Sequence, residues 1–133
     1  DSMVFQIVRL YLRTLQPYHR WFDSGDLADQ EQLMSIDMVA RLTPQINHWL
    51  PSKEYTLVKE YLLRNIPPKN LLIRVSAPMV DGKPSKHYQN TSTVHKNKSP
   101  QGFPCQARSR GNHCGECRAC WDMNVANVSY PKH

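Results

Sequence analysis

Cysteine is absent from the first 104 of 133 residues, only five residues are glycine, and long apolar runs are missing throughout. No apolar run approaches the roughly 20 residues of a membrane-spanning helix. Arg9 and Arg13 interrupt the apolar residues at the N-terminus, which is untypical of a signal peptide. The chain also lacks a P-loop, a GxGxxG motif and an HExxH motif. We therefore expect a soluble, cytoplasmic protein with no membrane partner.

Acidic residues are scarce in the second half of the chain. Residues 83–133 contain eight Lys or Arg residues and only two acids, whereas residues 1–82 contain nine of each, so the whole net charge of +6 lies after residue 82. This shift predicts a boundary there. A basic segment is typical either of a solvated tail or of a surface for phosphate or another anion.

The segment 1–82 predicts an α/β arrangement. Apolar spacing and breaker residues predict helices at 2–16, 27–42 and 51–65, and strands at 18–22, 46–50 and 71–77. The predicted strands begin at Tyr18, Ile46 and Leu71 with a helix between each pair, which is the spacing of parallel βα repeats. We expect residues 1–82 to form part of a (βα) barrel, with residues 83–133 as an irregular, cysteine-rich tail packed on it.

The apolar spacing and the breaker residues also predict the roles of several side chains in and beside the helices. Asp26 and Ser52 are the expected N-caps of the second and third helices, with Asp29 in a first turn. Met34, Met38, Tyr61 and Leu62 are expected to belong to the core.

The loops after the predicted strands are the candidate ligand site, because ligands bind at the carboxyl edge of parallel sheets. Three polar loops, "DSGD", "PSKE" and "SAPMVDG", are expected on that edge. A small anionic ligand or cofactor is the expected partner. The alternative is that these residues only cap helices and form turns. The candidate cofactor-binding residues are Ser24, Gly25, Asp26, Ser76 and Asp81.

All four cysteines are confined to the segment 105–120, in the pattern C-x8-C-x2-C-x2-C. Disulfides are rare inside cells, so this concentration predicts a metal site made by Cys105, Cys114, Cys117 and Cys120. The tight C-x2-C-x2-C run favours a [4Fe-4S] cluster, because structural zinc usually takes two separated pairs of ligands. Zinc stays the alternative metal.

Basic residues surround the cysteines. Arg108, Arg110 and Arg118 would offset the negative charge of thiolates around a metal. Alternatively, Lys96, Lys98, Arg108 and Arg110 would bind the phosphates of a nucleic acid. Trp121 is expected to pack over the metal site.

Several motifs together resemble the bacteriophage "gene product 88" family. They are "RWFDSGDL", "LTPQINHWLPSKEY", "IRVSAPMVDGKPSK", "NTSTVHKNKSPQGFPC" and "CGECRACWDMNVANVSYPKH", within residues 18–133. The resemblance implies a phage-encoded protein in a bacterial host cell. Longer members of that family carry a further N-terminal segment with its own cysteines, so a missing N-terminal segment or a companion chain is an expected partner.

A second resemblance concerns the segments around "SGDL" and "IRVSAPMVDG". They look like the middle of a radical S-adenosylmethionine barrel, in which a Gly-Gly-Glu motif contacts the methionine group and a later serine contacts the ribose. Ser24, Gly25 and Asp26 match the first position and Ser76 the second, which implies S-adenosylmethionine as cofactor. The chain departs from that pattern in having one glycine, Asp for Glu and no preceding CxxxCxxC loop.

Two functions are therefore predicted. The first is the carboxyl part of a metalloenzyme, with the cysteines as an auxiliary or structural cluster. The second is a metal-nucleated nucleic-acid-binding protein acting in phage replication or transcription.

Overall fold

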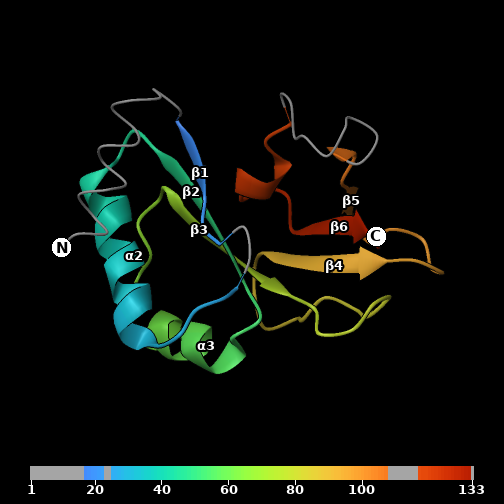
Figure 1. The fold of residues 1–133 in the computed structure, drawn as a ribbon, viewed down its shortest axis with the longest axis horizontal. Coiled ribbons are helices and arrows are strands. Elements are labelled where there is room, and N and C mark those ends of the chain that lie inside the picture. The colour runs from blue at the N-terminus through green and yellow to red at the C-terminus, as the bar shows by residue number, and fades with distance from the viewer. Residues whose placement is uncertain (1–16, 23–24, 108–116, 133) are drawn as a thin grey trace. The chain divides into compact units, whose positions relative to one another are not determined.

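The computed structural model describes residues 17–22, 25–107 and 117–132, which fall into two compact units (Figure 1). The units are Asp1–Leu72 and Ile73–His133. The helix expected at 2–16 lies outside the described residues. None of the helices in the described ranges has the length and apolar character needed to cross a membrane.

The fold is mixed α/β with parallel strands. The strand order is β1-β2-β3-β4-β6-β5, and the boundary between the units falls within β3. Strand β1 pairs parallel with β2, β3 with β4, β4 with β6, and β5 with β6, which confirms the predicted parallel arrangement. The elements are β1 (Tyr18–Arg20), α2 (Gln30–Leu42), β2 (Asn47–Ser52), α3 (Tyr55–Arg64), β3 (Leu71–Ser76), β4 (Thr91–His95), β5 (Phe103–Pro104), the 3-10 turn η2 (Ala119–Trp121) and β6 (Asn127–Pro131).

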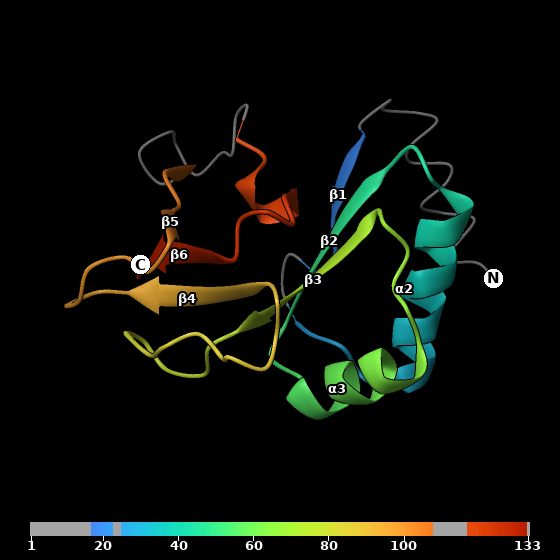
Figure 2. The ribbon, with the colours of Figure 1, turned by 180° about the vertical axis from the view of Figure 1, so that it is seen from behind.

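In the first unit, α2 and α3 lie on the same side of β1 and β2 (Figures 1 and 2). Helix α2 begins after Asp29, whose carboxylate accepts the backbone N–H of Gln32 at 2.8 Å, and it ends at Thr43. The prediction of Asp26 as the N-cap is therefore wrong, because Asp29 holds that position. The predicted cap of α3 is also wrong: Ser52 belongs to β2, and its hydroxyl accepts the N–H of Glu54 before the helix starts.

The core of the first unit is built from one stripe of each helix. Leu33, Ile36 and Val39 of α2 are fully buried, as is Tyr61 of α3. The core prediction is wrong for the other three side chains. They lie beside the buried stripes and keep 42 to 52% of their surface exposed. These side chains are Met34, Met38 and Leu62.

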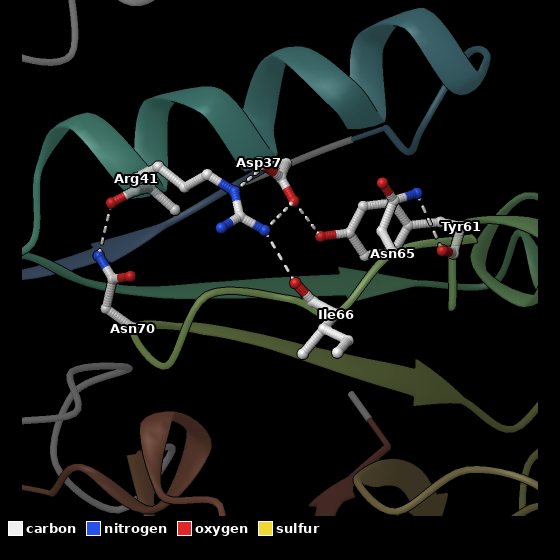
Figure 3. Close-up of polar contacts among 7 residues, drawn as sticks. Asp37, Arg41, Tyr61, Asn65, Ile66 and Asn70 are labelled. Carbon is white, nitrogen blue, oxygen red and sulfur yellow. Dashed lines mark hydrogen bonds and ion pairs between the residues drawn. The ribbon is translucent and has the colours of Figure 1, made fainter. Parts of the chain in front are cut away.

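A polar cluster joins α2 to α3 and to the chain that follows α3 (Figure 3). Buried Asp37 accepts the hydroxyl of Tyr61 and pairs with the guanidinium of Arg41 at 2.6 Å. Arg41 also donates to the carbonyl of Ile66 at 2.8 Å. Burial and the hydrogen bond to Asp37 raise the pKa of Tyr61. The buried carboxylate of this cluster therefore has both a cation and a hydroxyl donor.

A second polar group in the first unit is a buried histidine on β2. Trp21 donates its Nε1–H to Nδ1 of His48 at 3.1 Å, and His48 Nε2 lies 2.8 Å from the hydroxyl of Thr43. Thr43 donates its own proton to the carbonyl of Val39. His48 must therefore be neutral with its proton on Nε2, and burial lowers its pKa from 6.5 to about 4.

The second unit contains three strands in the segment predicted to be irregular, so that part of the prediction is wrong. Strand β4 pairs with β6 along its whole length, from Thr91 opposite Asn127 to His95 opposite Pro131. Figures 1 and 2 both show these strands side by side. Close packing also requires glycine at position 102, because a Cβ on Gly102 would lie 2.6 Å from the carbonyl oxygen of Asn127. The described part of the tail thus contains a sheet region held by backbone hydrogen bonds.

Candidate metal centre

Two of the four cysteines lie beside strand β6. The N–H of Cys105 donates to the carbonyl of Ser129 at 2.8 Å, which continues the pairing of β5 with β6. The Sγ of Cys120 lies 2.9 Å from the hydroxyl of Tyr130. These cysteines stand at the two ends of the cysteine segment in the sequence, and each contacts a residue of β6, Ser129 for Cys105 and Tyr130 for Cys120.

Tyr130 of β6 is the group that the thiol of Cys120 contacts. Its pKa is raised well above 10, first by burial and then by the charge and hydrogen bond of Cys120 and by the charge of Cys105. The phenol therefore keeps its proton at neutral pH. A phenol in this state is a hydrogen-bond donor for a thiolate.

Arg74 of β3 connects the sheet to the turn that carries Cys120. Its side chain is 0% exposed. A guanidinium has five N–H groups, and each finds a backbone carbonyl here, so the side chain is fully satisfied. The acceptors are Thr91, Ala119, Cys120, Asp122 and Ala126, at N···O distances of 3.0 to 3.2 Å.

The charge of Arg74 is not balanced by a buried carboxylate within the described residues. Its five acceptors are neutral carbonyls, and burial lowers the pKa of the guanidinium. The acidic groups that act against this effect are Cys120, Tyr130 and Asp122, in decreasing order. Asp122 is exposed, and its carboxylate accepts the N–H of Asn124. Cys120 is the buried member of these three groups, and only its thiolate, not the neutral thiol, would balance the charge of the guanidinium.

The four-cysteine prediction is only partly covered by the structure. Cys114 lies outside the described residues. Cys105, Cys117 and Cys120 are not joined in disulfides, and Arg118 donates to the carbonyl of Cys117 at 2.9 Å. Within residues 17–22, 25–107 and 117–132, no three Cys, His, Asp or Glu side chains group as metal ligands. The four-cysteine site therefore stays a prediction. Thiolates are the ligands that structural zinc and iron–sulfur clusters take.

Trp121 follows Cys120 in η2. The guanidinium of Arg118 lies over its ring, 5.8 Å from the ring centroid. Arg118, one of the three arginines expected around the cysteines, therefore makes a cation–π contact with Trp121. Arg108 and Arg110, the other two, lie outside the described residues.

The predicted cofactor residues of the first unit have structural partners. Ser24 lies outside the described residues, and Gly25 has a φ of +87°, which suits a turn. The carboxylate of Asp26 accepts the hydroxyl of Ser52 at 2.7 Å and the N–H of Lys53 at 2.8 Å. It also accepts the N–H of Leu27, so Asp26 ties the loop after β1 to the end of β2.

The predicted cofactor residues of the second unit also have partners. The hydroxyl of Ser76 lies 2.8 Å from that of Ser92 on β4. The carboxylate of Asp81 accepts the backbone N–H groups of Lys96, Asn97 and Lys98 at 2.8 to 3.1 Å. These hydrogen bonds lower the pKa of Asp81, whose own backbone has a φ of +59°. Convergence of these residues with Asp26 stays a prediction, because the two sets belong to different units.

The loop at residues 96–98 contains two of the residues predicted to bind nucleic acid. Lys96 and Lys98 stand in it, and their backbone N–H groups surround the carboxylate of Asp81. A negative charge at the centre of the loop weakens its attraction for phosphate.

One nucleophile candidate is excluded by burial. His95 Nδ1 lies 2.7 Å from the hydroxyl of Ser129, which resembles a serine–base pair. Ser129 is 0% exposed, so no substrate reaches it and the contact is structural.

Arg74 and Tyr130 were not among the residues singled out from the sequence. The signal for Arg74 is a charged residue in the apolar run "LLIRVSA", since arginine is almost never fully buried without partners. Tyr130 carries no comparable signal, because its partner Cys120 is defined only by the fold.

A known protein family matches most of the chain. The sequence model of that family, described as Gene product 88, covers residues 3–123. No curated protein and no solved structure matches the chain.

Proposed function

The chain belongs to the Gene product 88 family, and from its own residues we propose that it is a metal-binding protein of phage type. The ligands in this proposal are Cys105, Cys114, Cys117 and Cys120. The centre is a [4Fe-4S] cluster, with zinc as the alternative metal.

The buried charge of Arg74 is the observation that carries this proposal. An unbalanced charge inside a protein costs several kcal/mol, so buried charges are normally paired. Among the described residues Arg74 lacks a buried carboxylate, and Cys120 is the first of the acidic groups near it. A metal centre bound by four thiolates carries net negative charge, which would balance the guanidinium.

The ligand spacing favours iron. Three thiols in a C-x2-C-x2-C run suit the wrapping of a loop around a cubane, as in ferredoxin-type sites. A bound cluster would supply one-electron transfer, whereas zinc would supply structural stability. The parallel βα arrangement supports the wider part of the proposal, a metalloenzyme resembling radical S-adenosylmethionine barrels in which this centre is auxiliary or structural. Asp26 is assigned no cofactor contact, because its oxygens already accept the groups of Leu27, Ser52 and Lys53.

Anaerobic purification followed by metal and sulfide analysis tests the proposal. We expect one centre per chain, coloured if it is an iron–sulfur cluster and colourless if it is zinc. Cys117→Ser should remove the metal. Ala107→Ser is the matched control, because it introduces a hydroxyl in the same region and keeps all four thiols. Wild-type protein without stoichiometric metal, or Cys117→Ser protein with full metal content, would contradict the proposal.

A further inference from the structure

We propose that Arg74 and Tyr130 are the positioning residues of the metal centre, and that Cys120 is its anchored ligand. This inference rests on the proposed function and goes beyond the identity of the four ligands. It assigns to two residues outside the cysteine segment the control of how firmly the metal is held.

Tyr130 acts on the sulfur atom of Cys120. The phenol oxygen lies 2.9 Å from Sγ, within the range of an O–H···S hydrogen bond. The ring belongs to β6, whose neighbour Ser129 accepts the N–H of Cys105. The hydroxyl is thus fixed by the sheet and not by the loop. One donor from a rigid strand restricts where Cys120 places its sulfur.

Arg74 acts on the backbone that carries Cys120. Three of its five acceptors belong to the short segment from Ala119 to Asp122, which contains η2. The other two acceptors are Thr91, the first residue of β4, and Ala126, which directly precedes β6. The guanidinium therefore ties this turn to the sheet through a single buried side chain.

Position and charge are separate contributions of Arg74. The planar guanidinium offers five donors in a fixed geometry, whereas a lysine ammonium offers three. Arg74→Lys therefore keeps the positive charge and loses part of the positioning. Arg74→Gln removes the charge and keeps one amide donor group. The two variants distinguish a counterion from a purely structural anchor.

Cys120 differs in this respect from Cys105 and Cys117. Cys120 is buried, whereas the other two described cysteines are half-buried. The turn around it is the part of the cysteine segment held by Arg74. We expect Cys120 to keep its position in the apoprotein and the metal to assemble on it.

The first experiment compares wild-type protein with Tyr130→Phe, which removes one oxygen and keeps the ring. After anaerobic reconstitution with iron and sulfide, or with zinc, a chelator removes the metal and the rate is recorded. Loss of an outer-sphere partner typically costs about 10- to 100-fold in metal affinity. We expect Tyr130→Phe to lose its metal about 10-fold faster, and an iron–sulfur cluster to shift to lower reduction potential. Tyr55→Phe on α3 is the matched control and should behave as wild type.

The outcomes separate the two proposals. Wild-type protein that binds no metal overturns the proposed function and this inference with it. Wild-type protein that binds metal, with equal release rate and equal potential in Tyr130→Phe, overturns the positioning role alone.

The second experiment reconstitutes Arg74→Lys and Arg74→Gln under the same conditions. We expect the lysine variant to bind metal with faster release than wild type, and the glutamine variant to release it faster still. Equal release rates in the two variants would show that the charge of Arg74 plays no part. If either variant fails to fold, Tyr130→Phe still decides the inference, because it alters a single hydroxyl.

Discussion

The two units differ in how their buried charges are balanced. In the first unit, the carboxylate of Asp37 has a cation and a hydroxyl beside it, and His48 is neutral between Trp21 and Thr43. In the second unit, Arg74 is charged, fully buried and surrounded by neutral carbonyls. The first arrangement is complete without a ligand, whereas the second is balanced only when an anion lies nearby.

This difference explains why the second unit is the place to look for function. A buried charge that is balanced by neighbouring side chains stabilises the fold and requires no ligand. A buried cation costs stability unless something negative binds near it. Cys120 stands first among the acidic groups beside Arg74, and thiolates are negative when they bind a metal.

Arg74→Met should give the largest change in stability. Methionine fills much of the same volume but leaves five backbone carbonyls without their donor. Each buried unsatisfied group costs roughly 1–3 kcal/mol, although water reaches some of them. We expect the free energy of unfolding to fall by more than about 3 kcal/mol, as is typical when one side of a buried polar network is removed. Denaturant titration measures it, and a loss below about 1 kcal/mol would show that the carbonyls find other donors.

Acidification should weaken β2 before it weakens the loop at residues 96–98. The pKa of His48 is lowered from 6.5 to about 4, so the unfolded chain binds a proton in this range and the folded chain does not. Stability contributed by the neutral ring is complete above pH 6.5 and falls as the pH drops to about 4. The total loss is about 3 kcal/mol. The pKa of Asp81 is lowered below 3.8, so its contribution persists above that value and disappears only as the pH falls further.

Hydrogen exchange at a series of pH values resolves this order residue by residue. Amides of β2 should lose protection between pH 6.5 and about 4, while amides of residues 96–98 keep theirs. The variant His48→Gln should lack the pH dependence of β2. An unchanged dependence in that variant would assign the effect to another group.

Tyr61→Phe should have a moderate effect. It removes the hydroxyl that donates to buried Asp37, and a hydrogen bond to a charged group contributes about 1.5–3 kcal/mol. Arg41→Gln is the comparison, since its side chain is 52% exposed and an exposed ion pair contributes little. Thermal unfolding of both variants checks the order. A larger loss for Arg41→Gln would reverse our assignment of the important partner.

Asp81→Asn should have the smallest effect. The amide keeps one oxygen for the three N–H groups of residues 96–98 and loses the negative charge. We expect faster amide exchange confined to that loop and no change in metal content. A loss of metal in this variant would contradict this expectation and connect the loop to the cysteines.

The sequence allowed the βα part of the fold to be predicted, because its signals are local. The apolar run "LLIRVSA" became β3, and the break at Thr43 ended α2. The cap of α2 was misplaced because Asp26 and Asp29 are chemically alike. Their roles differ only because Asp26 binds Ser52, which is distant in the sequence.

Strands β4 and β6 were missed for a related reason. They are polar, and their buried side chains satisfy one another across the sheet, as when Thr91 donates to Asn127 at 2.8 Å. These partners are far apart in the sequence, so no local pattern shows the pairing. The cysteine spacing could be recognised in the sequence. The contacts of Cys120 with Arg74 and Tyr130 could not, because they depend on the pairing of these same strands.

X-ray absorption spectroscopy at the metal edge tests the central claim most directly, because it identifies the atoms bound to the metal. We predict a first shell of about four sulfur atoms at about 2.3 Å, as expected for thiolate ligation, with cluster sulfide included if the metal is iron. Cys120→Ser should reduce the sulfur shell or abolish binding. A first shell of nitrogen or oxygen at about 2.0–2.2 Å, without sulfur, would show that the cysteines do not hold the metal and that Arg74 has no thiolate centre to balance.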